Sequence, residues 1–295
     1  MTDAGAPSAR GGTLYVVATP IGNLADLTLR AIETLRAVPV IAAEDTRHTH
    51  RLLERHAIPT RTTSFHARSG PGRLEALLVH LRGGDDLALV TDAGTPAVSD
   101  PGADLVVAWA AEGGSVVPIP GASAVLAAVV ASAVVGPRWS FEGFLPRSGR
   151  ERRERIARIA ADERATLVFE APGRVAATLR DLAAACGLDR PGAVCRELTK
   201  LHETIVRGTL DELATAAAAG TIPARGEFVL VVGARTAGSA DPAGAAVAAE
   251  DALAAARAEV ARLVASGVAR GDAARRVAAA TGLPRRGLYA AETLD

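Results

Sequence analysis

Short apolar segments alternate with helical segments through the first half of the chain, and this alternation constrains the fold more than any other feature. The apolar segments are Leu14–Ala18, Val40–Ala43, Leu87–Thr91 and Val116–Ile119, and helical segments are expected at 27–35, 49–56, 73–82 and 105–111. Strands that are apolar throughout are buried on both faces of a sheet. The pattern therefore predicts an α/β fold with a mostly parallel sheet that helices cover on both sides.

A second set of elements follows Pro137. We expect strands at 139–145, 166–170, 193–198, 203–207 and 227–233, with helices at 150–162 and 174–186. A chain of 295 residues suits two domains better than one. The predicted organisation is a disordered tail at 1–11, an N-terminal α/β domain at 12–136, a second α/β domain at 137–234, a linker at 235–248 and a small C-terminal helical segment at 249–295.

Composition excludes several classes of protein. The 33 basic side chains balance 33 acidic ones, so the chain does not find nucleic acid by bulk charge. Aromatic residues make up 3%, too few for a surface that stacks single-stranded bases. No nucleotide-binding P-loop is present, no G-x-G-x-x-G follows a strand, and we expect no metal site.

The long uncharged stretch at Ser115–Pro137 is not expected to cross a membrane. Its uninterrupted apolar part, 122–135, is too short to span about 30 Å of hydrocarbon. We interpret the stretch as a strand, a turn and a buried helix. A soluble cytoplasmic protein is expected.

Four unusual loops follow the strands of the first half, at 19–24, 44–47, 92–102 and 120–124. In an open α/β sheet, ligands bind beyond the carboxyl ends of the strands. In the third loop, Gly94 and Gly102 allow a close approach of backbone to ligand, and Asp92 and Asp100 add acceptors. Ser123 is an N-cap candidate for the helix that follows the fourth loop. These loops predict a cleft for a nucleoside-like ligand.

The same loops resemble a known family, the tetrapyrrole-methylase superfamily of S-adenosylmethionine enzymes. The resemblance is carried by Thr13–Leu24, Ala42–Arg47, Asp92–Pro96, Ser99–Gly102 and Pro118–Gly121. Glu142–Pro146 and Arg196–Lys200 resemble the branch that methylates the ribose 2′-hydroxyl of a cytidine in small-subunit (16S) ribosomal RNA. The resemblance implies two α/β domains with S-adenosylmethionine in the cleft between them, a homodimer, and ribosomal RNA or the 30S subunit as substrate.

The resemblance also indicates which residues contact the cofactor. We expect Pro20, Asp92, Gly94, Thr95, Val98, Ser123, Ala124, Glu170, Gly226 and Glu227 at that site. Two positions depart from the family pattern: Gly173 stands where relatives often carry His, and the turn at 120–123 lacks a second proline.

Lys200 is the leading candidate for the group that activates the acceptor hydroxyl. It is the single lysine in the chain, and lysine can lose its proton on burial, whereas arginine stays charged. Lys200→Arg is accordingly expected to keep cofactor binding and lose most methyl transfer. The alternative bases are Glu44, Asp45, Asp100 and Glu170.

Arginines cluster at two places that suit phosphate contacts. The candidates are Arg47, Arg51, Arg147, Arg150, Arg152 and Arg153. Two other functions stay open at this point: a small-molecule methylase acting on a tetrapyrrole, and an RNA-binding assembly factor without catalysis.

Overall fold

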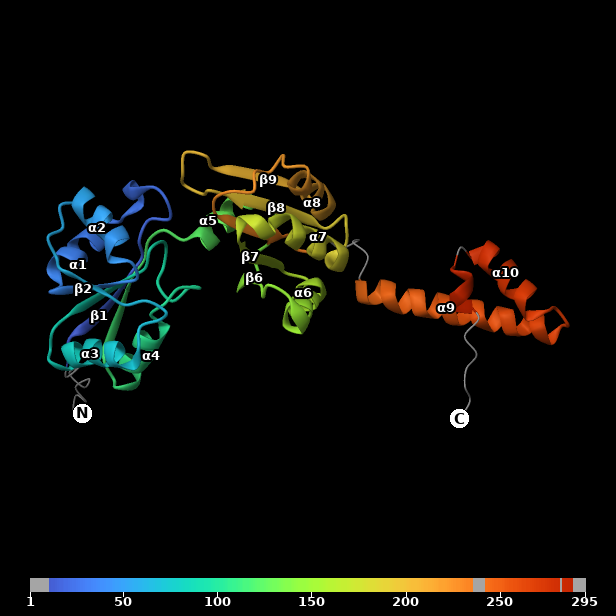
Figure 1. The fold of residues 1–295 in the computed structure, drawn as a ribbon, viewed down its shortest axis with the longest axis horizontal. Helices are drawn as coiled ribbons and strands as arrows, with labels where there is room; N and C mark the ends of the chain where they lie inside the picture. Colours follow the sequence, from blue (N-terminus) through green and yellow to red (C-terminus); the bar gives the residue numbers. More distant parts are fainter. Residues whose placement is uncertain (1–10, 236–241, 282, 289–295) are drawn as a thin grey trace, which may run out of the picture.

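The chain is built around two five-stranded sheets, one in each of its two main parts (Figure 1). The structure is a computed structural model that describes residues 11–235, 242–281 and 283–288. The predicted tail at 1–11 lies outside the described residues except for Gly11, which lies against Trp109. The two sheets confirm the predicted fold class, an α/β protein with two sheet-containing parts.

The first sheet is parallel throughout and has the order β3-β2-β4-β1-β5. Its strands are β1 (Thr13–Val17), β2 (Val40–Ala43), β3 (Thr62–Ser64), β4 (Leu87–Val90) and β5 (Ser115–Ile119). Every residue of β2 and β4 is buried, as their uninterrupted apolar character predicts. The edge strand β3 was not predicted, because three polar residues carry no strand pattern.

Helices cover both faces of this sheet (Figure 1). Helices α1 (Leu29–Ala37) and α2 (Thr46–Arg55) pack on one face, and α1 buries Ala31 and Leu35 there. On the other face lie α3 (Pro71–Arg82) and α4 (Ala103–Ala111), which bury Leu81 and Trp109. Two apolar layers therefore hold the carboxyl ends of β1, β2 and β4 in fixed positions.

The second sheet is mixed and has the order β6-β7-β10-β8-β9. Its strands are β6 (Trp139–Phe144), β7 (Ala165–Glu170), β8 (Pro191–Arg196), β9 (Thr204–Thr209) and β10 (Phe228–Val232). Strands β6 and β7 are parallel, and the remaining pairs are antiparallel. One face is covered by α6 (Gly149–Ala161), α7 (Val175–Cys186) and α8 (Leu210–Ala218).

The opposite face of the second sheet is covered by α5 (Ala124–Ser132), whose Val125 and Ala128 pack in the same apolar cluster as Val229. Figure 1 shows α5 beside β8. This differs from the sequence prediction, which placed residues up to 136 with the first domain. The prediction of a buried helix holds for one face only, because Leu126 and Val130 on α5 are 54% and 83% exposed.

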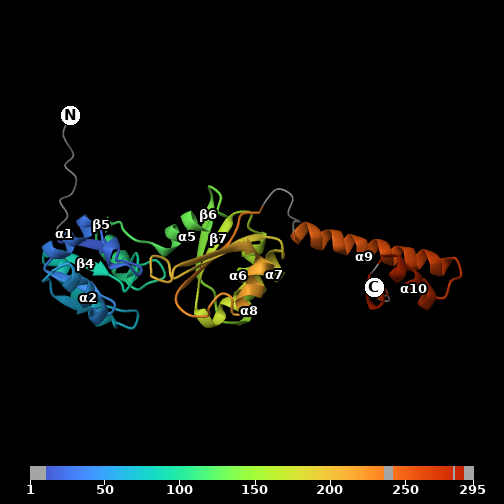
Figure 2. The same ribbon diagram turned by 90° about the horizontal axis from the view of Figure 1, so that it is seen from above.

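The C-terminal part is helical, as predicted. Helix α9 (Pro242–Ala265) packs against α10 (Arg270–Thr281) and a short 3-10 turn, η3 (Arg285–Leu288), and Figure 2 shows them extending away from the sheets. The predicted linker at 235–248 is too long, because α9 begins at Pro242 and its alanines favour a helix. No helix in the described ranges is long and apolar enough to cross a bilayer.

Candidate active site

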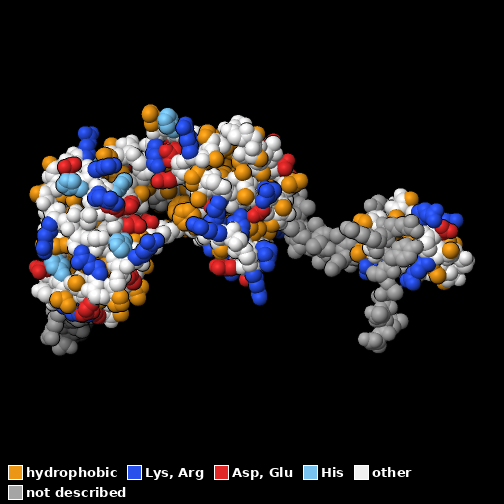
Figure 3. All heavy atoms as spheres, in the orientation of Figure 1, with side chains coloured by type: hydrophobic (Ala, Val, Ile, Leu, Met, Phe, Trp, Pro, Cys, Tyr) orange, Lys and Arg blue, Asp and Glu red, His pale blue; other side chains and the backbone are white. Residues whose placement is uncertain are grey.

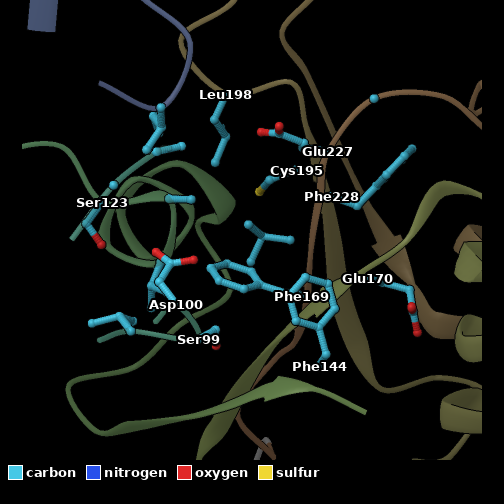
Figure 4. Close-up of a pocket in the computed structure, with 18 of the residues that line it drawn as sticks. Ser99, Asp100, Ser123, Phe144, Phe169, Glu170, Cys195, Leu198, Glu227 and Phe228 are labelled. Atoms are coloured by element: carbon cyan, nitrogen blue, oxygen red, sulfur yellow. The ribbon is translucent and has the colours of Figure 1, made fainter. Parts of the chain in front are cut away.

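A cavity of about 410 Å³ lies between the loops of the first sheet and the second sheet (Figure 4). This volume is within the usual range for small-molecule sites. The first half contributes Ile21, Ala93, Gly94, Thr95, Val98, Ser99, Asp100, Ser123, Ala124 and Val125. The second half contributes Phe144, Phe169, Glu170, Ala171, Pro172, Cys195, Leu198, Gly226, Glu227, Phe228 and Val229. We call this space the main pocket.

The main pocket brings together eight of the ten residues expected to contact the cofactor. They are Gly94, Thr95, Val98, Ser123, Ala124, Glu170, Gly226 and Glu227. The other two, Pro20 and Asp92, line a second cavity instead. The expected residues thus lie around two neighbouring cavities, because the sequence does not show on which side of a loop each side chain lies.

The wall formed by the second sheet was largely missed. Phe169 packs edge-on against Phe141 with ring centroids 4.8 Å apart, and Phe144 lies 5.5 Å from Phe169. Cys195 and Phe228 complete this apolar side (Figure 4). A usable signal was present, since these residues lie at or near the strand ends of β6, β7, β8 and β10.

The loop at 92–102 adopts backbone conformations that are rare for L-residues. Gly94 and Gly102 have φ of 77° and 108°, and Ala97 and Ser99 both have φ of 67°. Non-glycine residues in this region carry local strain, which proteins concentrate at ligand-binding sites. The loop is held at its base, where Thr19 and Gly94 exchange both backbone hydrogen bonds, at 2.9 and 3.0 Å.

The amino terminus of α5 opens into the main pocket. The Ser123 side chain accepts a hydrogen bond from the Leu126 amide at 3.4 Å, which confirms the predicted N-cap. Ser123 and Ala124 both line the pocket. A helix amino terminus favours an anion such as a carboxylate.

Asp100 is one of two candidate bases that line the main pocket, the other being Glu170. Its Oδ2 accepts a hydrogen bond from Thr91 Oγ1 at 3.3 Å. Burial and, next, the negative charge of Glu44 raise the pKa of Asp100 to about 6. Burial also raises the pKa of Glu44, although Glu44 does not line the pocket. A carboxyl with such a pKa is ionised at neutral pH and can still accept a proton.

Asp45 is held in a different way. Its Oδ1 caps α2 by accepting from the Arg47 amide at 2.8 Å, and its Oδ2 pairs with the Arg47 guanidinium at 2.7 Å. The hydrogen bond from the Arg47 side chain, followed by that from its amide, lowers the pKa of Asp45. Asp45 is therefore a poor proton acceptor, and its observed role is to cap the helix.

Lys200 does not fit the role of a deprotonated base. Its Nζ lies 2.9 Å from Glu197 Oε1 and 3.0 Å from Glu227 Oε2. Burial lowers the pKa of Lys200, but the hydrogen bonds to Glu197 and Glu227 outweigh burial and the net shift is upward. The expectation of a depressed pKa is thus wrong, and Lys200 lines neither cavity.

Glu170 lines the main pocket, but neighbouring residues hold its carboxylate. The side chain is fully buried and accepts from Thr178 Oγ1 at 2.6 Å and from the Ala171 amide at 2.8 Å. Arg174 pairs with it at 3.1 Å from within the 3-10 turn η2 (Pro172–Arg174). With its oxygens occupied in this way, Glu170 holds the pocket loop at Ala171 in place and is not available as a base.

The predicted RNA-binding arginines fall into three groups. Arg152 is buried and donates to Thr178 Oγ1 at 3.0 Å and Asp181 Oδ2 at 2.9 Å, so its assignment to RNA is wrong. Arg47 and Arg150 are exposed in ion pairs with nearby acidic residues. The third group is exposed and makes no ion pair or side-chain hydrogen bond within the described part of the chain: Arg51, Arg147 and Arg153.

Figure 3 shows basic and histidine side chains gathered over α2 and arginines over α6. The two clusters thus lie on different halves of the chain. Their positions are compatible with a polyanion that crosses from one half to the other.

The family model of the Tetrapyrrole (Corrin/Porphyrin) Methylases matches residues 13–214. The chain belongs to this family. A protein of Synechocystis sp. named "Ribosomal RNA small subunit methyltransferase I" is 46% identical over 278 residues, which cover 94% of this chain and 96% of the relative. A relative with the same name from Micromonospora olivasterospora is 44% identical over 96% of this chain and 87% of its own length. The chain is therefore a methyltransferase of that branch of the family.

Solved structures share the fold of this methyltransferase. A cobalt precorrin-4 methyltransferase superposes with a TM-score of 0.58 at 20% identity, over 75% of this chain and 94% of that one. A uroporphyrin-III C-methyl transferase from Thermus thermophilus, complexed with S-adenosyl homocysteine, gives a TM-score of 0.54 at 20% identity, over 75% and 97% of the two chains. At this identity the likeness concerns the fold alone.

The residues of the main pocket suit the methyl donor that this family implies. An apolar aromatic wall at Phe169 and Phe228 can receive a planar ring, and the amino terminus of α5 can receive a carboxylate. Asp100 supplies negative charge for a cationic centre. This combination fits a zwitterionic nucleoside that carries a sulfonium group.

Proposed function

We propose that this methyltransferase modifies the ribose 2′-hydroxyl of a cytidine in small-subunit (16S) ribosomal RNA, with S-adenosylmethionine as methyl donor. The observation that carries the proposal is the similarity to proteins named as small-subunit ribosomal RNA methyltransferases over almost the whole chain. The main pocket supports it, because eight expected cofactor residues line one cavity.

The residues of the main pocket act mainly by position. S-adenosylmethionine, when bound, supplies a methyl group on a positively charged sulfur. Gly94, Thr95 and Val98 form one side of the site, on a loop whose base is joined to Thr19 by two backbone hydrogen bonds. Alignment of two reactants in a near-attack geometry contributes about 7–11 kcal/mol to a rate. A loop with a hydrogen-bonded base is consistent with this requirement for alignment.

Asp100 is the residue that we assign to the acceptor proton. It lines the main pocket, and its carboxylate accepts the proton as the ribose oxygen attacks. A pKa of about 6 leaves it ionised at neutral pH. A correctly placed base of this kind contributes about 10²–10⁴-fold. Lys200 instead holds the loop at 197–200 through its two ion pairs.

Arg51, Arg147 and Arg153 are the arginines that we assign to the RNA backbone. Each is exposed and unpaired in the described part of the chain, so binding a phosphate breaks no existing ion pair. We also propose a cytoplasmic protein that acts on the 30S subunit or its RNA. A homodimer is consistent with the exposed Leu126 and Val130, which lie one turn apart on α5.

The direct test supplies the purified chain with labelled S-adenosylmethionine and either 30S subunits or free 16S RNA that lack the modification. We expect 2′-O-methylcytidine in nuclease digests analysed by mass spectrometry. A tetrapyrrole precursor serves as the competing substrate. Transfer to the tetrapyrrole with none to either RNA would refute the proposal, and so would binding of RNA without measurable affinity for S-adenosylmethionine.

A further inference from the structure

A second cavity of about 240 Å³ lies in the first half of the chain. It is lined by Thr19, Pro20, Gly22, Leu24, His48, Thr49, Arg51, Leu52, Thr91 and Asp92. These residues come from the loop after β1, the 3-10 turn η1 (Leu24–Asp26), helix α2 and the end of β4. We call this space the α2 cavity. Nothing in the cofactor role of the main pocket accounts for it.

The α2 cavity and the main pocket share a wall. Along the loop after β1, Pro20 and Gly22 line the α2 cavity, while Ile21 between them lines the main pocket. Along the loop after β4, Asp92 lines the α2 cavity and the following Ala93 lines the main pocket. The two spaces are therefore neighbours that share these two loops.

The hydroxyl group of Thr49, a residue of the α2 cavity, has an unused capacity for hydrogen bonding within the described residues. The residue is 3% exposed, and its Oγ1 is buried with no hydrogen-bond partner among the residues that the structure describes. Buried hydroxyls in native proteins are nearly always paired, because an unpaired one is costly. Thr49 lines the α2 cavity, so a ligand that enters can reach the hydroxyl after a small rotation of the side chain and pair with it.

The other walls indicate the kind of ligand. Pro20, Leu24 and Leu52 provide apolar surface for the faces of a flat ring. Asp92 Oδ1 accepts from the Asp45 amide at 3.1 Å, which fixes the carboxylate while Oδ2 makes no hydrogen bond within the described residues. Carboxylates read cytosine by accepting from its exocyclic amino group.

The volume of the α2 cavity and the charge of Arg51 on its wall give further information on the ligand. The volume is below the usual range for drug-sized ligands and suits one nucleobase. Arg51 is exposed, has no partner in the described ranges and lies on the wall of the cavity. It is placed to contact a phosphate of a nucleotide whose base is inside.

We propose that the α2 cavity binds the base of the nucleotide that is methylated, with the amino group of cytosine on Asp92 and a base oxygen or ring nitrogen on Thr49. The inference rests on the proposed function and adds the site that receives the acceptor. The nucleotide leaves its stack to enter, as enzymes that act on single nucleotides commonly require. Its ribose is then next to the shared wall, on the side of the methyl donor.

Thr49→Val tests the hydroxyl without changing the shape of the side chain. Because the hydroxyl is unpaired in the free protein, we expect the thermal midpoint to stay the same or rise and the affinity for S-adenosylmethionine to stay unchanged. The kcat/KM for 30S subunits should fall about 3- to 10-fold, the value of one hydrogen bond. Thr215→Val on the exposed side of α8 is the matched control and should leave all three values unchanged.

Asp92→Asn tests the reading of the base. Asn keeps an acceptor for the Asp45 amide and replaces the free oxygen by an amino group, which favours the carbonyl of uracil. We expect the preference for a substrate with cytosine over one with uracil at the methylated position to fall at least about 10-fold, the value of one bidentate or charged contact. If the wild-type enzyme methylates RNA, and both Thr49→Val and Asp92→Asn retain its kcat/KM and its base preference, the α2 cavity is not the acceptor site. If the wild-type enzyme methylates no RNA, the proposed function itself fails.

Discussion

Gly22 and Lys200, one from each half of the chain, lie in direct contact. A Cβ atom on Gly22 would lie 2.3 Å from Lys200 Cγ and 2.7 Å from its Cε. The absence of a side chain at Gly22 therefore creates the space in which the Lys200 stem reaches its two carboxylates. The contact joins the loop after β1 to the loop at 197–200, and both loops contribute to the main pocket.

We predict that Gly22→Ala displaces Lys200 and lowers methyl transfer by at least about 10-fold, because a 1 Å misplacement at an active site can cost two orders of magnitude. Unfolding should occur at a lower temperature by several degrees, since the new methyl group overlaps the lysine stem. Gly72→Ala, in α3, is the control because open space surrounds that position. Equal activity of Gly22→Ala and Gly72→Ala would show that the contact between Gly22 and Lys200 is not needed for methyl transfer.

Substitutions of Lys200 distinguish two roles for this residue: a base that accepts a proton, and a cation that pairs with Glu197 and Glu227. The structure revises the expectation for Lys200→Arg: arginine preserves the charge between Glu197 and Glu227, so a substantial part of the activity should remain. Lys200→Met should lose much more, because two carboxylates are left facing each other. Steady-state kinetics of both variants decide the matter; an equally deep loss in both would restore Lys200 as a proton acceptor.

The same ion pairs give a pH dependence of stability. The hydrogen bond from Lys200 lowers the pKa of Glu197 below its usual value. A carboxyl whose folded-state pKa is lowered stabilises the fold above its unfolded pKa, and this contribution is lost as the pH falls through the folded value. Thermal unfolding of wild type and Lys200→Met should therefore differ most above about pH 5 and converge in acid. A constant difference across the whole range would contradict this account.

Asp100 predicts the pH profile of the reaction. With a pKa raised to about 6 by burial and by Glu44, the carboxylate form needed to accept a proton accumulates as the pH rises through that value. Activity should increase tenfold per pH unit well below 6 and level off above about pH 7.

Asp100→Asn should lose about 10²–10⁴-fold in single-turnover rate while it still binds S-adenosylmethionine. Because the raised pKa means that ionised Asp100 destabilises the fold at neutral pH, the variant should be more stable there, on the order of 1 kcal/mol after allowance for solvent screening. A flat pH profile in the wild type would remove Asp100 from the reaction.

Arg152 and Arg153 are neighbours in the chain with opposite roles. Arg152→Ala removes a buried guanidinium that donates to Thr178 and Asp181, and should cost about 1–3 kcal/mol of unfolding free energy. Arg153→Ala should change stability by less than about 0.5 kcal/mol and reduce the log–log salt slope of RNA binding by about 0.7. Chemical denaturation and RNA titration over a range of salt check both. Equal effects of the two variants on RNA affinity would argue against the assignment.

The sequence predicted the elements that have a strong pattern and missed those that depend on context. Val40–Ala43 has the same bounds in the sequence prediction and in the structure, because a buried parallel strand is apolar throughout. Helix α8 was missed, although its capping box of Thr209 and Glu212 is a recognisable start signal. Exposure of Leu126 and Val130 could not be foreseen, because an apolar helix does not reveal which neighbours it has.

Some features of the candidate site could likewise be predicted from the sequence, and others could not. The loop after β4 was identified from its glycines, prolines and carboxylates, and Gly94, Thr95 and Asp100 do line the main pocket. Sequence could not tell that Lys200 is neutralised by Glu227, since 27 residues separate the two and only the pairing of β8 with β10 brings them together. Arg152 was misassigned for a similar reason: its helix was correct, but its buried face was unknown.

The paired backbone hydrogen bonds between Thr19 and Gly94 have a consequence for how such an enzyme can change. The loops after β1 and β4 are joined into one partition, with the main pocket on one side and the α2 cavity on the other. If donor and acceptor bind as proposed, a substitution in these loops that changes the acceptor site also changes the binding site of the methyl donor. Altered substrate choice is therefore easier to reach from the α2 side, where side chains can vary while the partition stays intact.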